Sequence, residues 1–126
     1  MVLVFWVLES FFSPSFGKQD RPATLEIAIL RDADRLAATG AIAIMRTFAS
    51  SGQMNRPLYH LEDPFAVARE TDSKKFALDL FYERLLIARK RMYTQTAKDL
   101  ADSRTEYLKS FLNQLESELN CVEYTT

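Results

Sequence analysis

Histidine, cysteine and glycine are scarce in this 126-residue chain, and each shortage excludes a class of chemistry or fold. The single histidine, His60, lies between a tyrosine and a leucine, so there is no His-Asp dipeptide and no His-Glu-x-x-His motif. The one cysteine, Cys121, cannot form an intrachain disulfide, which makes the cytoplasm the default compartment. Three glycines and four prolines are too few for a β-barrel or sandwich. We therefore expect an all-α protein with about four to five helices.

A strong charge excess and a long apolar run are also lacking. Sixteen basic and seventeen acidic residues give a formal net charge of −1, which offers no electrostatic argument for nucleic acid or an anionic membrane surface. Residues 1–16 form an apolar N-terminal segment, but Glu9 interrupts it before the roughly twenty apolar residues that a membrane span needs. A signal peptide would also begin with basic residues. We expect neither nucleic acid nor a membrane as a partner.

The remaining chain divides into two pairs of helices joined by a long loop. Helical periodicity predicts one helix over residues 22–39 and another over 41–50, broken at Gly40. Residues 51–75 contain a glycine and two prolines and are predicted to be a loop, which at this length is typical of a functional or mobile segment. Two closing helices are expected within residues 76–122, the first over 76–92 and the second from about Thr96.

Apolar residues at three- and four-residue spacing predict which faces are buried. The first helix has one stripe (Leu25, Ile29, Ala33, Leu36), and each closing helix has another (Ala77, Phe81, Leu85, Ala88, Met92; Ala97, Ala101, Leu108, Phe111, Leu115, Leu119, Val122). Asp34 lies at the edge of the first stripe, where a carboxylate needs a cation, a hydrogen-bond donor or a metal. From spacing alone, a surface ion pair with a nearby arginine explains it well.

A motif in the first two helices carries a family resemblance. Asp32-Ala33-Asp34-Arg35-Leu36, followed by Gly-Ala-Ile-x-Ile-x-Arg-Thr-Phe at residues 40–48, resembles the C-terminal half of HD-domain phosphohydrolases, specifically a small branch thought to hydrolyse nucleotides. Further matching positions, among them Arg56-Pro57-Leu58-Tyr59 and Phe81-Tyr82-Glu83, extend the resemblance over roughly residues 20–118. It implies that the chain is a single incomplete HD-like helical domain.

The resemblance implies a metal site of which this chain holds little. The family coordinates a divalent metal through a histidine, a His-Asp pair and a late aspartate, and the late aspartate matches Asp34, with Asp32 as the alternative. The other ligands have no counterpart, and Ala37 replaces an aspartate that usually follows the motif. We therefore expect no catalytic residue set and no bound cofactor on this chain, which would be a fragment or a degenerate relative.

Two arginines are the candidates for binding substrate phosphate. Arg35 follows the metal-binding position, and Arg46 lies in an apolar helix, where it needs a carboxylate or a phosphate as partner. An ion pair of Arg46 with Asp32, Asp34 or Glu83 is the structural alternative. The functional hypotheses are a catalytically incomplete phosphohydrolase relative, which binds nucleotide only if active, or a non-catalytic helical interaction protein. In a complete HD domain, the N-terminal half would supply the partners of these apolar stripes. We therefore expect the chain to self-associate or to bind a missing N-terminal half.

Overall fold

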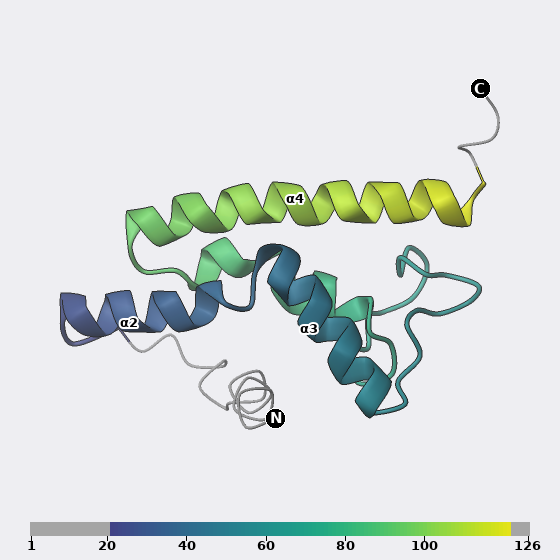
Figure 1. Ribbon diagram of the computed structural model, residues 1–126, viewed down its shortest axis with the longest axis horizontal. Helices are drawn as coiled ribbons and strands as arrows, with labels where there is room; N and C mark the ends of the chain where they lie inside the picture. Colours follow the sequence, from purple (N-terminus) through teal and green to yellow (C-terminus); the bar gives the residue numbers. More distant parts are fainter. Residues whose placement is uncertain (1–20, 122–126) are drawn as a thin grey trace.

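Every regular element in the computed structural model, which describes residues 21–121, is a helix. Three α-helices, α2 (Leu25–Leu36), α3 (Gly40–Gln53) and α4 (Gln95–Leu119), are accompanied by a π-helix, η2 (Phe81–Leu85), and a 3-10 helix, η3 (Ala88–Arg91). The long α4 lies along one side of the molecule, with α2, α3 and the two short helices against it (Figure 1). The predicted all-α class is confirmed. The apolar segment 1–16 and Val122 lie outside the described residues.

The first two helices lie where the sequence predicted them, but they begin and end at other residues than predicted. α2 begins after Thr24, whose hydroxyl accepts a hydrogen bond from the Ile27 N–H at 3.3 Å, as an N-cap does. It ends at Leu36, and α3 starts at Gly40, which has a φ of +70°. α3 continues to Gln53, three residues beyond the predicted end. No helix among residues 21–121 is both long and apolar enough to cross a bilayer.

The predicted helix over residues 76–92 is not a continuous α-helix. Its start is bound to the preceding loop, since the N–H groups of Ala77 and Leu78 donate to the carbonyls of Pro57 and Leu58. The N–H of Leu86 then donates to the Phe81 carbonyl, five residues back, as in a π-helix. The five apolar positions predicted for this segment are nevertheless all buried (Ala77, Phe81, Leu85, Ala88, Met92).

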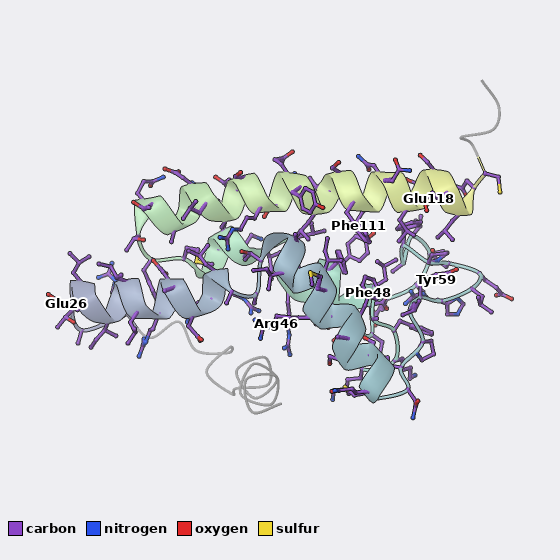
Figure 2. The ribbon with its side chains drawn as sticks, viewed as in Figure 1. Glu26, Arg46, Phe48, Tyr59, Phe111 and Glu118 are labelled. Atoms are coloured by element: carbon purple, nitrogen blue, oxygen red, sulfur yellow. The ribbon has the colours of Figure 1, made fainter. Side chains whose placement is uncertain are left out.

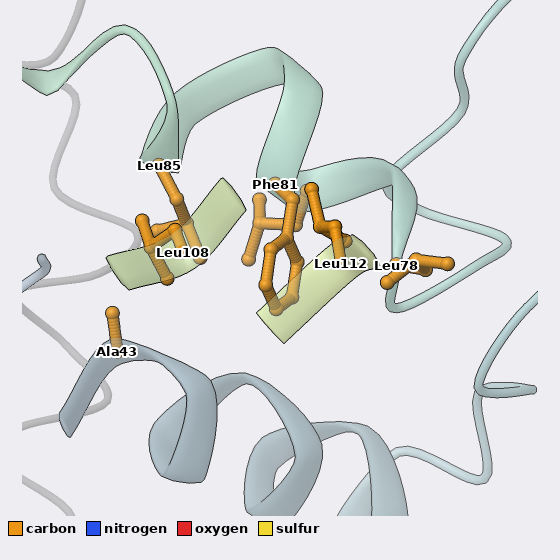
Figure 3. Close-up of a cluster of buried hydrophobic side chains, with 7 residues drawn as sticks. Ala43, Leu78, Phe81, Leu85, Leu108 and Leu112 are labelled. Atoms are coloured by element: carbon orange, nitrogen blue, oxygen red, sulfur yellow. The ribbon is translucent and has the colours of Figure 1, made fainter. Parts of the chain in front are cut away.

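The main core lies where η2, α3 and α4 meet. Phe81 is fully buried and packs with Phe48 of α3 and Phe111 of α4, with ring centroids 6.0 and 5.8 Å away. Figure 3 shows Ala43 of α3 pointing towards Leu108 of α4 and Leu85 of η2. A second cluster joins η3 to the start of α4 (Ala88, Met92, Ala97, Ala101).

The stripe predicted to be buried on α2 is exposed. Leu25 and Ile29 are 66% and 53% exposed, Ala33 is exposed, and Leu36 is half-buried. The buried residues of α2 are Ala28 and Asp32 instead. The cause is that α4 packs against one edge of the stripe and leaves an open, mainly apolar groove of about 440 Å³ along it. A helical period identifies residues that share a face, whereas burial depends on what covers that face.

The loop between α3 and η2 is held by a buried ion pair that the sequence did not reveal. Arg69 donates two hydrogen bonds to the carboxylate of Asp79, at 2.6 and 2.9 Å, and the Asp79 side chain has no exposed surface. The N–H of Asp72 also donates to Asp79. Arg56 adds a bond to the Ser73 carbonyl. These contacts give the loop one defined path despite its length.

Candidate functional site

Asp32, the alternative metal-ligand candidate, has a structural role in this chain. Its side chain is 2% exposed and accepts three hydrogen bonds at 2.8 Å, from the N–H groups of Tyr93 and Thr94 and from the Thr94 hydroxyl. Thr94 is the N-cap of α4, and its hydroxyl also accepts from the Ala97 N–H. Asp32 therefore joins α2 to the start of α4, and its oxygen atoms are occupied by protein donors.

Asp34 has the opposite environment. It lies on the exposed side of α2, about 200° around the helix from Asp32. Its basic neighbour is Arg46 of α3. Burial lowers the pKa of Arg46, and the charge of Asp34 has a smaller effect in the opposite direction. The Arg46 guanidinium also donates to the Ala37 carbonyl at 2.9 Å, which places it at the junction of α2 and α3 (Figure 2). Asp34 is one of the three carboxylates that the sequence offered as ion-pair partners of Arg46, and its charge acts on that arginine.

Arg35 is part of a group of arginines. It donates to the Arg91 carbonyl at 2.5 Å and lies over the Tyr93 ring, 4.9 Å from the centroid. Arg35, Arg84 and Arg91 line one small cavity between α2, η2 and η3. The pKa of Arg91 is lowered, mainly by burial and also by the charges of Arg84 and Arg35. The sequence showed the basic run at residues 84–91, and a solvated helix end that complements the helix dipole was the favoured interpretation of it.

Tyr59 and His60 of the long loop are held by packing and turn formation. His60 accepts hydrogen bonds at Nδ1 from the N–H groups of Glu62 and Asp63, both at 3.2 Å, and its ring packs edge-on against Phe76. Tyr59 is half-buried against the main core. Neither residue lies in a cluster of ligands.

The described residues do not fit a metal ion. Across residues 21–121, no three side chains of histidine, cysteine, aspartate or glutamate come together as a metal would require. Asp34 is a single exposed carboxylate, and Asp32 is fully engaged by Tyr93 and Thr94.

Comparison with known proteins gives a consistent group of relatives. No protein-family model matches the chain. The uncharacterised protein YpgQ of Bacillus subtilis (strain 168) is 30% identical over 105 residues, which cover 83% of this chain and 45% of that protein.

Solved structures extend the likeness to the fold. An HD-superfamily hydrolase from Bacillus thuringiensis is 36% identical with a TM-score of 0.65, over 77% of this chain and 47% of its own. YpgQ of B. subtilis in complex with ADP is 33% identical with a TM-score of 0.62, over 75% and 44%. A protein from Lactobacillus plantarum is 31% identical with a TM-score of 0.69, over 94% and 60%. The chain thus spans about half the length of the relatives that it matches.

Proposed function

We propose, from the likeness of this chain to HD-superfamily hydrolases, that it provides the phosphate-binding side of a nucleotide phosphohydrolase domain and does not catalyse hydrolysis alone. The observation that carries the proposal is the surface around Asp34. This carboxylate is exposed beside Arg46 and shares its helix face with Leu30, which is 73% exposed. An exposed carboxylate with apolar neighbours suits a site that another part of an HD domain completes.

A nucleotide is the substrate class that best suits the arginines. The B. subtilis relative has been solved with ADP, and guanidinium groups form paired hydrogen bonds with phosphate oxygens. Arg35 directly follows Asp34 on α2, and Arg46 of α3 is the basic neighbour of that carboxylate. In this proposal they contact phosphate, and Asp34 is the one metal ligand that the chain contributes.

Catalytic incompleteness follows from the ligand count. The only histidine of the 126 residues is His60, and its Nδ1 already accepts two backbone N–H bonds. A metal in this superfamily supplies an activated water for attack on phosphorus. One carboxylate cannot hold such an ion in a defined geometry. We derive no hydrolytic step from the residues present.

The direct test measures metal content and nucleotide hydrolysis on the purified chain. We expect well below one transition metal per chain and no hydrolysis above the background without protein. Asp34→Asn should change neither measurement. Close to one metal per chain, lost in Asp34→Asn, would overturn the proposal of incompleteness.

A second test addresses the missing ligands. Co-expression with the N-terminal half of a related HD hydrolase, which carries the histidine and the His-Asp pair, should give a complex that co-purifies. Asp34→Asn should then lower the metal content of the complex. Failure to form a complex with several such halves would contradict the proposed role of this surface.

A non-catalytic interaction protein is the alternative that a specific observation favours. Ile42 and Met45 on α3 are 60% and 71% exposed and lie on the same side of that helix as Arg46. Such a surface suits a partner protein whether or not a metal site is completed. The two functions differ in the second test: an interaction protein would bind its partner equally well when Asp34 is changed and would never gain metal.

A further inference from the structure

An open groove lies between α2 and the start of α4, and its lining is mainly apolar. Leu25, Ile29 and Leu36 belong to the wall on α2, and Ala97 and Leu100 belong to the wall on α4. Figure 1 shows α2 running beside the first turns of α4. The space measures about 440 Å³, which falls within the range of pockets that bind apolar ligands, roughly 300–1,000 Å³. The groove is therefore large enough to take several side chains.

The walls of this groove are exposed in the described part of the chain. Leu25 and Ile29 are 66% and 53% exposed, and Leu100 is 43% exposed. The one charged residue of the lining, Asp32, is 2% exposed, and its carboxylate already accepts three hydrogen bonds. An occupant of the groove would thus meet apolar side chains and no unpaired charge. Such a surface favours an occupant that is itself apolar.

The sequence holds an apolar segment that is joined to this groove by a short stretch of chain. Ten of residues 1–12 are apolar, the exceptions being Glu9 and Ser10, and residues 1–8 are the longest uninterrupted apolar run of the sequence. Leu25 both begins α2 and lines the groove, so only residues 13–24 separate the segment from it. Twelve residues can span up to about 40 Å, whereas the 12 residues of α2 are about 18 Å long. The segment can therefore reach every part of the groove.

From these observations we propose that residues 1–12 of the same chain occupy the groove between α2 and α4. Their docking removes apolar surface of both the segment and the groove walls from water. A segment that is linked to its site binds at an effective concentration of about a millimolar, far above that of a second copy in dilute solution. The inference does not rest on the proposed function, because that function uses the side of α2 with Asp34 and Leu30, and neither residue lines the groove.

Trp6 allows a test on the full chain, because it is the only tryptophan of the sequence and lies within the segment. In the native chain its fluorescence should be shifted to shorter wavelength and protected from acrylamide, relative to the chain in urea, at every protein concentration. Leu25→Glu and Leu100→Glu each place a charge on one wall and should move both readings towards those of the urea-unfolded chain. Leu30→Glu is the matched control, since Leu30 is 73% exposed on α2 and lies outside the groove. That variant should leave both readings unchanged.

Nuclear magnetic resonance gives a second readout that needs no substitution. The Trp6 indole protons of the native chain should show nuclear Overhauser contacts with methyl groups of Leu25, Ile29 or Leu100. The absence of these contacts, or a solvent-exposed Trp6, would overturn the proposal. Protection of Trp6 that both wall variants retain, with their helices intact by circular dichroism, would also overturn it. Protection that disappears on dilution would do the same and assign the groove to a second copy of the chain.

Discussion

Asp32 and Asp34 are two residues apart on α2, and the fold gives them different roles. Asp32 is buried and receives three hydrogen bonds from the segment that starts α4, whereas Asp34 faces outwards beside Arg46. If the Asp32 carboxylate is removed, the N–H groups of Tyr93 and Thr94 lose their acceptor. The aspartate that matters for stability is therefore not the one that the family resemblance assigns to the metal.

The first prediction concerns this pair of aspartates. Asp32→Ala should lower the free energy of unfolding by about 3 kcal/mol, because three hydrogen bonds to a buried charge are lost together. Asp34→Asn should change it by less than about 0.5 kcal/mol, as expected for an exposed position. Urea denaturation followed by circular dichroism measures both. A loss of similar size in the two variants would contradict these assignments.

The ion pair of Arg69 with Asp79 gives the second prediction. Arg69→Gln should lower the free energy of unfolding by about 3 kcal/mol, because Asp79 would remain buried without its cation. Arg89→Gln removes an exposed pair with Asp102 and should cost at most about 1 kcal/mol. Limited proteolysis should cut the loop over residues 54–80 faster in Arg69→Gln alone. Equal cleavage of both variants would show that this pair does not hold the loop.

At the scale of elements, the junction of α2 and α3 depends on Gly40 and Arg104. Gly40 has a positive φ, and a Cβ placed there would lie 3.1 to 3.3 Å from side-chain carbons of Arg104. The same arginine reaches from α4 to donate to the Leu36 carbonyl at 2.7 Å, at the end of α2. This contact provides a donor for a carbonyl at the C-terminal end of α2. It also attaches the turn between α2 and α3 to α4.

The third prediction tests that junction. Gly40→Ala should lower the free energy of unfolding by about 2 kcal/mol, since an L-residue at this φ is strained and Arg104 must move. Gly52→Ala is the control in the same helix: a Cβ there meets nothing within 4 Å, and the exchange should stabilise by up to about 1 kcal/mol. Urea denaturation distinguishes the expected loss of stability in Gly40→Ala from the expected gain in Gly52→Ala. A neutral Gly40→Ala would contradict the proposed strain.

At the scale of the whole molecule, apolar surface on α2 and α3 is the dominant feature. Leu25, Ile29 and Leu30 of α2 and Ile42 and Met45 of α3 are all more than half exposed. The formal net charge of −1 provides almost no repulsion between copies. Exposed apolar side chains on two successive helices favour association.

The fourth prediction is self-association that depends on this surface. Sedimentation should show an average mass that rises with protein concentration, and Leu30→Glu should reduce the rise. Leu61→Glu is the control, because Leu61 is 87% exposed in the loop, away from both helices. A monomer at every concentration, or an equal effect of Leu61→Glu, would contradict it.

The sequence by itself determined the helical class, the approximate places of the α-helices and the resemblance to HD-domain hydrolases. Local periodicity was sufficient for the closing segments, where all five residues predicted on one face, from Ala77 to Met92, are buried. The motif from Asp32 to Phe48 led to the superfamily in which the relatives are found. These features depend on residues close together in the chain, whose relative positions the helical repeat fixes.

The tertiary structure alone decided which faces are covered and which charges meet. Asp32 finds its donors 61 and 62 residues away, and Arg35 meets Arg91 after 56 residues. The stripe at Leu25 and Ile29 is exposed because α4 covers only one edge of it. A period reports which side chains share a face of a helix, but the partner of that face comes from distant parts of the chain, and burial and charge pairing follow from that partner.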